Sequence, residues 1–171
     1  MGQEKLGLVK YDKKYITEDG DYQYGLNEDG TARILKYLGN GAAIEVPERL
    51  DGHKVTGLNF AAFAGNTTIR SVKLPKTIRY IGKAAFWECN NLYSITIPEG
   101  VTHIDKEVFS MCKELSWVYL PESLVCLGGK AFLGNRGVIT VVVPEGSYAE
   151  ARCRKFGLKT LKIIYADKTN S

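Results

Sequence analysis

Apolar side chains recur through the middle of the chain with a fixed period of 23 residues, and two markers carry that spacing through four successive units. The marker phenylalanines are Phe63, Phe86, Phe109 and Phe132, and the marker prolines are Pro75, Pro98, Pro121 and Pro144. Seven such columns over four units contain 28 residues, and all of them are apolar although the chain as a whole is 44% hydrophobic. Self-similarity at this period predicts a stacked solenoid rather than a globule built around one central core.

Each unit predicts two short strands and a compact turn. Leu92–Pro98 follows the pattern Leu-x-x-Ile-x-Ile-Pro, in which alternate side chains point inward and the proline ends the strand because it lacks the N–H group that a sheet needs. Val101–Ile104 predicts a second extended piece, and the Ala-Phe sequence after it suits a helical or 3₁₀ turn that places phenylalanine inside. One inward column consists of Ile69, Leu92, Leu115 and Val138. Several coils must stack, because one coil cannot bury its own apolar side.

The segments outside the repeats predict caps at both ends of the solenoid. The expected division is a flexible N-terminal arm over 1–21, a capping hairpin over 22–46, the repeat units over 47–144 and a C-terminal cap over 145–171. Asn27–Gly30 lies between two alternating stretches, which is a hairpin signal. Ser147 can begin a helix, with Glu150 three residues later completing a capping box, and Gly157 can end it.

The repeat unit resembles that of the BspA-like, or Treponema-type, leucine-rich repeat proteins. In one unit the resemblance rests on Leu92, Ile95, Ile97, Pro98, Val101, Ile104, Val108, Phe109 and Cys112. It implies an α/β fold, a right-handed solenoid with short parallel strands stacked into a sheet and short helical or 3₁₀ turns opposite. It also implies a β-hairpin cap at the N-terminal end and a helical cap at the C-terminal end. For function it implies surface display on bacteria and binding of proteins or host cells, and it carries over no catalytic residue.

The length and charge of the chain set broad limits on its domain count and its class of partner. The chain has 171 residues, which predicts one domain, and its 23 basic and 19 acidic residues give a mild net charge of +4 that does not call for nucleic acid. We expect the basic excess over 147–171 to be a solvated helix face, with an anionic partner as the alternative. No run of 18 apolar residues predicts membrane insertion. Residues 1–20 lack the apolar region of a signal peptide, so localisation stays open between the cell surface that the resemblance implies and the compartment of synthesis.

Cysteine and histidine offer no predicted catalytic or metal centre. Cys89 and Cys112 share one repeat position with two asparagines, and we expect free buried thiols there rather than a disulfide. No Cys-x-x-Cys pair indicates a zinc site. His53 and His103 have no carboxylate or cysteine at ligand spacing. The sequence therefore predicts a protein that is not an enzyme and that uses no metal or cofactor.

The outward positions of the repeat strand hold the candidate site. They form two rows, which are Ala43, Ser71, Ser94, Trp117, Thr140 and Glu45, Lys73, Thr96, Tyr119, Val142. Trp117 and Tyr119 are large aromatic residues that break a series of small polar residues in these rows. Exposed tryptophan and tyrosine are favoured binding anchors. We expect Tyr93 and Ile139 to flank them, so the candidate ligand contacts are Trp117, Tyr119, Tyr93, Val142 and Lys73. The alternative is that the N-terminal arm or a second copy covers these rings, or that they have no binding role.

Two hypotheses for function follow. The first is a non-enzymatic binding or adhesion module that engages a protein or glycan ligand, including one from a host, through its strand face. The alternative is a structural or self-assembling scaffold that forms homo-oligomers without a dedicated ligand. An enzyme is the weakest reading, because no nucleophile, base and metal set is clustered in the sequence.

Overall fold

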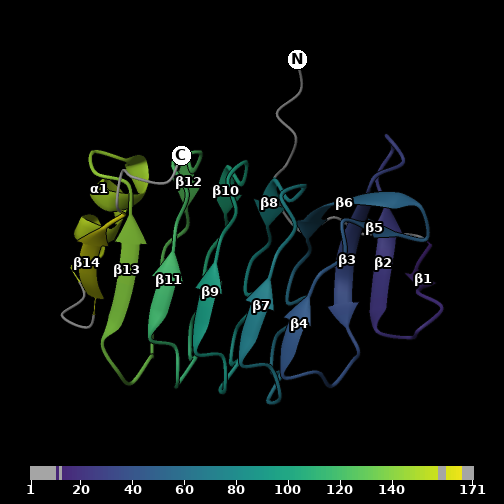
Figure 1. Ribbon diagram of the computed structural model, residues 1–171, viewed down its shortest axis with the longest axis horizontal. Helices are drawn as coiled ribbons and strands as arrows, with labels where there is room; N and C mark the ends of the chain where they lie inside the picture. The colour runs from purple at the N-terminus through teal and green to yellow at the C-terminus, as the bar shows by residue number, and fades with distance from the viewer. Residues whose placement is uncertain (1–10, 12, 158–160, 167–171) are drawn as a thin grey trace.

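The computed structural model describes residues 11, 13–157 and 161–166, which wind into a solenoid with two sheets along its length (Figure 1). The first sheet, called here the front sheet, has the strand order β14-β13-β11-β9-β7-β4, and every pairing in it is parallel. Its strands are β4 (Ala43–Glu45), β7 (Ser71–Lys73), β9 (Ser94–Thr96), β11 (Trp117–Tyr119), β13 (Ile139–Val143) and β14 (Leu161–Tyr165). The predicted stack of short parallel strands is confirmed.

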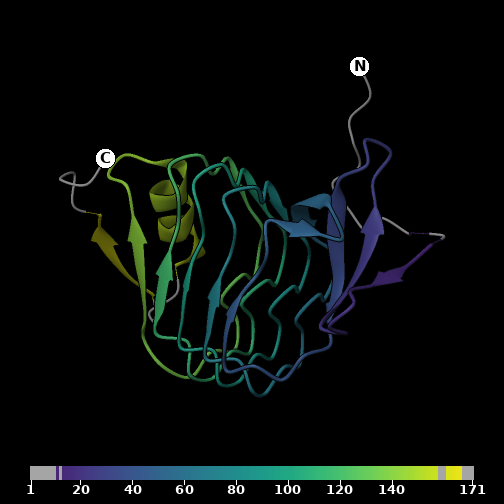
Figure 2. The same ribbon diagram turned by 45° about the vertical axis from the view of Figure 1, so that its right-hand side comes forward.

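The second sheet has the order β1-β2-β3-β6-β8-β10-β12, with β5 pairing with β6 beside this path. Its strands are β1 (Tyr15–Ile16), β2 (Tyr22–Leu26), β3 (Ala32–Tyr37), β5 (Arg49–Leu50), β6 (His53–Leu58), β8 (Tyr80–Ile81), β10 (His103–Ile104) and β12 (Cys126–Leu127). The two-residue strands β8, β10 and β12 are the second extended pieces of the repeat. Each lies between the proline that ends a front strand and the turn that carries phenylalanine, so the coils that begin with β7, β9 and β11 each contribute one strand to both sheets (Figure 2).

The marker phenylalanines form one internal row between the sheets. Successive rings stack with planes 13–16° apart and centroids 5.0 Å apart from Phe63 to Phe86, 5.9 Å from Phe86 to Phe109 and 5.8 Å from Phe109 to Phe132. All four are buried, as are 27 of the 28 residues in the apolar columns. Burying one such side chain contributes roughly 1.5–3 kcal/mol, so the columns are the main source of stability.

Val138 is the exception, and its prediction as a core residue is wrong. Its side chain is 60% exposed, whereas its neighbour Ile139 is fully buried. In earlier coils the front strand has three residues, but β13 has five and begins at Ile139 because it pairs along its whole length with β14. Alternation along this longer strand places Ile139, Val141 and Val143 inward, so the preceding residue points out. The expectation that Ile139 flanks an outward site is wrong for the same reason.

The N-terminal end of the core is covered by the hairpin of β2 and β3, as predicted. Tyr37 of β3 extends the aromatic row, stacking on Phe63 at a centroid distance of 5.4 Å. The segment 1–21, expected as a flexible arm, contains β1, whose Tyr15 pairs with Tyr24 and stacks on its ring at 5.3 Å. Residues 1–10 and 12 of that segment lie outside the described residues.

The C-terminal end carries the helix α1 (Tyr148–Phe156), which begins and ends where the sequence predicts. The Ser147 side chain accepts a hydrogen bond from the Glu150 backbone N–H, and Gly157 ends the helix in a left-handed conformation with φ 61°. The predicted capping box is modified, because the Glu150 carboxylate accepts from the backbone N–H of Gly146 rather than from that of Ser147. The aromatic row ends on this helix, where Phe156 meets Phe132 edge to face at 6.1 Å.

Candidate functional site

The outward face of the front sheet, called here the strand face, carries two neighbouring aromatic rings on β11. Trp117 and Tyr119 have ring centroids 6.4 Å apart and planes within 18° of each other. Trp117 is half-buried and Tyr119 is 40% exposed. In register beside Trp117 lie Ser94 and Thr140, both small, so the indole projects above its neighbours. The structure therefore places these two predicted contacts together on one strand, with part of each ring open to solvent.

Val142 was predicted as an exposed contact, and this prediction is wrong. It does take an outward position on β13, but it is only 7% exposed. Tyr119 of β11 lies in register on one side of it and Ile164 of β14 on the other, and these larger side chains cover it. Val142 therefore serves as an apolar support behind Tyr119. Its coverage depends on β14, whose paired residue Ile164 follows Val142 by 22 residues and which sequence alternation alone does not place.

Lys73 and Tyr93, the other two predicted contacts, lie apart from each other. Lys73 is on β7, where its Nζ forms an exposed ion pair with Glu45 Oε1 at 2.6 Å. The strand β9 lies between it and β11, so Lys73 is not gathered with the aromatic rings. Tyr93 immediately precedes β9 and is 54% exposed. It is close to Trp117, because the Trp117 backbone N–H donates to the Tyr93 carbonyl oxygen at 3.3 Å.

An open hollow that was not predicted from the sequence lies beside Tyr93. It has a volume of about 330 Å³ and is lined by Arg70, Asn91, Tyr93 and Glu114. These residues come from two repeat columns, since Arg70 and Tyr93 occupy one position of the 23-residue unit and Asn91 and Glu114 another. The 23-residue period places these residues in register, but neither column keeps one residue type, so nothing in the sequence indicates that they form a hollow.

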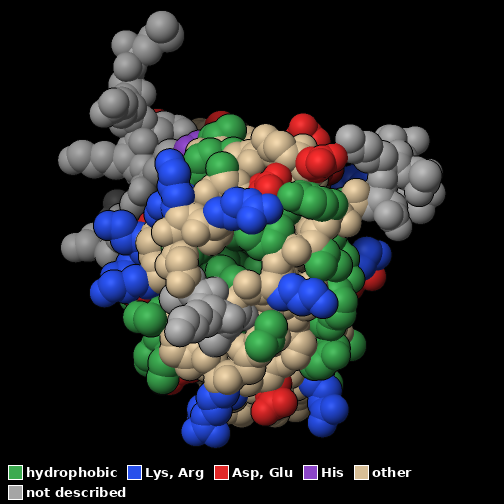
Figure 3. All heavy atoms as spheres, turned by 90° about the vertical axis from the view of Figure 1, so that its left-hand side faces the viewer, with side chains coloured by type: hydrophobic (Ala, Val, Ile, Leu, Met, Phe, Trp, Pro, Cys, Tyr) green, Lys and Arg blue, Asp and Glu red, His purple; other side chains and the backbone are tan. Residues whose placement is uncertain are grey.

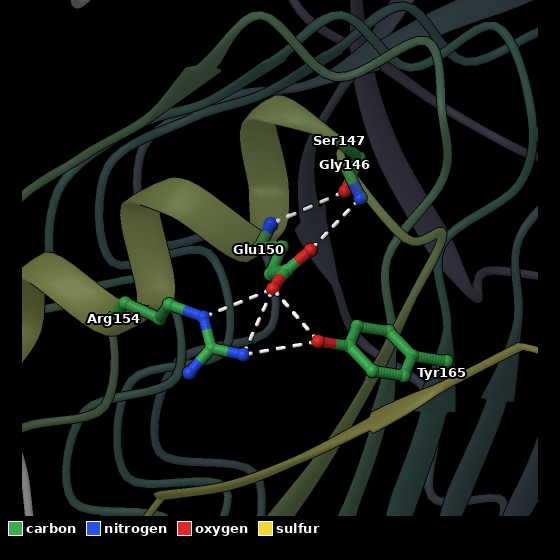
Figure 4. A network of polar contacts seen from close by, with 5 residues as sticks. All are labelled: Gly146, Ser147, Glu150, Arg154 and Tyr165. Atoms are coloured by element: carbon green, nitrogen blue, oxygen red, sulfur yellow. Dashed lines mark hydrogen bonds and ion pairs between the residues drawn. The ribbon is translucent and has the colours of Figure 1, made fainter.

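The end of the strand face is fixed by a network of polar contacts between α1 and β14 (Figure 4). One oxygen of Glu150, Oε1, accepts from Arg154 Nε at 2.9 Å and from the Tyr165 hydroxyl at 3.0 Å, while Oε2 accepts from Gly146 at 2.8 Å. These donors, the Gly146 backbone first and then Arg154 and Tyr165, hold the pKa of Glu150 below its ordinary value. The network joins the helix to the strand that covers Val142.

The chemical groups that could support catalysis are placed in structural roles. The four cysteines are free, which confirms the expectation for Cys89 and Cys112. Both are buried, and their thiols donate to the carbonyl oxygens of Phe63 and Phe86. Among the described residues, no group of three or more His, Cys, Asp or Glu side chains is placed to hold a metal ion. Within the same part of the chain, no helix has the length and apolar character that crossing a bilayer requires.

Several solved structures share this fold. A leucine-rich repeat protein from Treponema pallidum is 25% identical with a TM-score of 0.57, covering 89% of this chain and all of its own length. A leucine-rich repeat protein from Bacteroides ovatus is 26% identical with a TM-score of 0.64, covering 91% of this chain. A leucine rich cell surface protein from Faecalibacterium prausnitzii, at 24% identity and a TM-score of 0.57, shares the fold over 78% of this chain. This chain spans 37% of the Bacteroides protein and 46% of the Faecalibacterium protein.

No curated relative matches the chain. The model of the BspA type leucine rich repeat region, by contrast, matches residues 44–153 in six copies. The matched residues begin within the front strand β4 and include β7, β9, β11 and β13. Strand β14 lies beyond the matched residues and extends the front sheet to six strands. The matched residues cover well over half of the chain, and the stacked coils agree with the match, so this protein belongs to the BspA-type leucine-rich repeat family.

Proposed function

We propose that this protein is a non-enzymatic binding module that engages a protein or glycan ligand through the strand face around Trp117 and Tyr119. The observation that carries the proposal is the pair of adjacent, partly exposed rings on β11, set between the small side chains Ser94 and Thr140. Aromatic side chains at the centre of a surface are the residues that most often dominate binding energy. Leucine-rich repeat proteins commonly act as interaction or adhesion modules, which agrees with this reading.

The rigidity of the site supports a binding role. Trp117 and Tyr119 are on a strand that is hydrogen-bonded on both sides, to β9 and to β13. Between them, Val118 is fully buried in the core, so the backbone that presents both rings is fixed. A site held this way loses little conformational entropy when a ligand binds. The strand face is also continuous over neighbouring coils (Figure 1), which provides surface for a ligand larger than the two rings.

The test is binding of the full chain to an array of extracellular-matrix proteins and glycans, compared with the double variant Trp117→Ser/Tyr119→Ser. We expect the variant to lose at least tenfold in affinity for every ligand that the native chain captures, with nearly unchanged thermal melting. Phe60→Ser is the matched control, because Phe60 is 47% exposed but follows β6 of the second sheet. Retention of binding by the double variant would show that the strand face is not the site. Failure of the native chain to bind any array member would remove the module hypothesis.

A structural or self-assembling scaffold is the second candidate, and the C-terminal end favours it. In Figure 3, which looks onto that end, hydrophobic side chains gather near the middle of the face with Lys and Arg around them. Phe156, Leu161 and Ile163 pack against the core there but are only partly buried. Contact of two such ends would bury them further. Light scattering distinguishes the two candidates, since the scaffold requires an oligomer and a monomer at all concentrations contradicts it.

A further inference from the structure

We infer that the hollow formed by Arg70, Asn91, Tyr93 and Glu114 binds a neutral pyranose sugar, so that the ligand of the strand face is a glycan. This inference rests on the proposed function and names its ligand class. The hollow and the rings are neighbours, because Tyr93 lines the one and its carbonyl oxygen accepts from the backbone N–H of Trp117. A sugar seated in the hollow therefore leaves the rest of its chain at the edge of the aromatic pair.

The frame of the hollow is set by three successive coils. Arg70 and Tyr93 immediately precede β7 and β9, and the Tyr93 backbone N–H donates to the Arg70 carbonyl oxygen at 2.9 Å. Asn91 is fixed by its side-chain amide, which donates to the backbone carbonyl oxygen of Thr67. These backbone positions are held by the solenoid itself. The side chains consequently project from fixed points, as a preformed binding site requires.

The two charged side chains of the hollow, Arg70 and Glu114, are exposed to solvent. Arg70 offers donors and Glu114 offers acceptors, and within the described residues neither side chain has a hydrogen-bond or ion-pair partner, including each other. The Nδ2 group of Asn91 donates to the Thr67 carbonyl oxygen, which leaves Oδ1 of Asn91 as an acceptor for a ligand. A hydroxyl group both donates and accepts, so adjacent hydroxyls of one sugar ring can bridge a guanidinium and a carboxylate that do not meet.

The aromatic ring of Tyr93 and the opposite charges of Arg70 and Glu114 restrict the class of ligand further. Tyr93 is 54% exposed and presents an apolar surface to the C–H groups of a sugar ring. Arg70 and Glu114 have opposite charges, so a phosphorylated or sulfated ligand is repelled by one and a basic peptide by the other. An apolar peptide side chain would desolvate both charges without pairing them, which is unfavourable. A neutral polyhydroxyl ligand meets none of these penalties.

The size of the hollow agrees with a small ring rather than a folded partner. Its volume of about 330 Å³ is at the lower end of small-ligand sites, which span roughly 300–1,000 Å³. Protein–protein interfaces, by comparison, bury about 800 Å² on each partner and are depleted in glutamate. A hollow with a glutamate among its four lining residues is unlike the centre of such an interface.

The test uses saturation-transfer NMR and calorimetry on the full chain with cellobiose, maltose, lactose and N,N′-diacetylchitobiose. We expect at least one of them to receive transfer at its ring C–H protons. Arg70→Ala, Tyr93→Ala and Glu114→Ala should each lower that affinity at least tenfold. Lys113→Ala is the control, because Lys113 is exposed beside Glu114 but does not line the hollow. Melting curves of the three variants should match the native curve.

The contrary outcomes are distinct. No transfer to any of the four sugars overturns the inference. It is also overturned if the native chain binds glucose 6-phosphate more tightly than glucose, because the hollow is then an anion site. If the array identifies a protein ligand that depends on Trp117 and Tyr119 but not on Arg70 or Glu114, the strand-face function stands and the sugar site does not.

Discussion

The thiol of Cys112 donates a hydrogen bond to the backbone carbonyl oxygen of Phe86, with 3.0 Å between sulfur and oxygen. The same contact recurs one coil earlier, where Cys89 donates to Phe63 at 3.2 Å. One coil later the amide of Asn135 replaces the thiol and donates to Phe109 at 3.0 Å. Asn66, at the same repeat position, instead accepts from the backbone N–H groups of Thr68 and Ile69 in its own coil. At Cys89, Cys112 and Asn135 the side chain therefore supplies a donor to the turn of the preceding coil.

Removing that donor should destabilise the protein more than its size alone explains. Cys112→Ala removes one of two donors to the Phe86 carbonyl oxygen, which keeps the Cys89 backbone N–H, so the lost hydrogen bond should lower the free energy of unfolding by roughly 0.5–1.5 kcal/mol. Cys112→Ser keeps a donor and should lose less. Urea denaturation of the two variants measures the difference. Equal losses would show that the thiol acts through packing alone.

The phenylalanine row predicts a strong loss at its centre. Phe86 is fully buried between Phe63 and Phe109, so Phe86→Ala opens a cavity in the middle of the stack. We expect a loss of roughly 3–5 kcal/mol in the free energy of unfolding. Phe60→Ala, at an exposed position, should change it by no more than about 0.5 kcal/mol. A small effect at Phe86 in urea denaturation would contradict the stacked core.

The core could be read from the sequence because each coil repeats the same burial, so every column was sampled four times. The features that the sequence does not predict depend on contacts that the 23-residue period does not encode. Two such features follow from the pairing of β13 with β14. Ile139 rather than Val138 lies in the core, and Val142 is buried. That pairing joins segments about one repeat apart, but β14 lacks the proline and phenylalanine markers. Columns of mixed residue type, such as the one that holds Arg70, Tyr93, Ser116 and Ile139, have no shared chemistry by which to recognise them.

Buried ionisable groups should make the protein sensitive to alkali. Burial raises the pKa of the Cys89 thiol from 9.0 to about 12, and it also raises the pKa values of Cys112 and Tyr80. A raised pKa in the folded state means that folding favours the protonated form. This contribution is therefore complete below pH 9 and is lost as the pH rises from the unfolded toward the folded pKa. Urea midpoints should stay level up to about pH 9 and fall above it, and Cys89→Ser should flatten that fall. A midpoint that stays constant well above pH 9 would contradict this account.

One strained turn position offers a stabilising substitution. Glu88 has a φ of 56°, in the left-handed region, and the equivalent residues of the first and last coils are Gly65 and Gly134. The left-handed conformation costs a residue with a side chain roughly 1–2 kcal/mol. Against this, glycine adds about 0.4–1 kcal/mol of unfolded-state entropy, so Glu88→Gly should gain between about 0 and about 1.6 kcal/mol. Thermal melting measures it. Glu122→Gly, in a turn without positive φ, should lower the melting temperature, and a similar loss for Glu88→Gly would contradict the strain.

The polar network of Glu150 should control how firmly β14 covers the strand face. Glu150 joins α1 to Tyr165 at the end of β14, and Ile164 beside it covers Val142 behind Tyr119. Glu150→Ala removes this joint, so the β14 amides that pair with β13 should exchange their hydrogens faster, while those of β9 and β11 stay protected. Lys155→Ala is the control, because Lys155 lies on the same helix and has no partner among the described residues. Equal exchange in both variants would mean that strand pairing alone holds β14. Faster exchange confined to β14 in Glu150→Ala would show that the contact between α1 and β14 stabilises the strand that covers Val142 behind the aromatic pair.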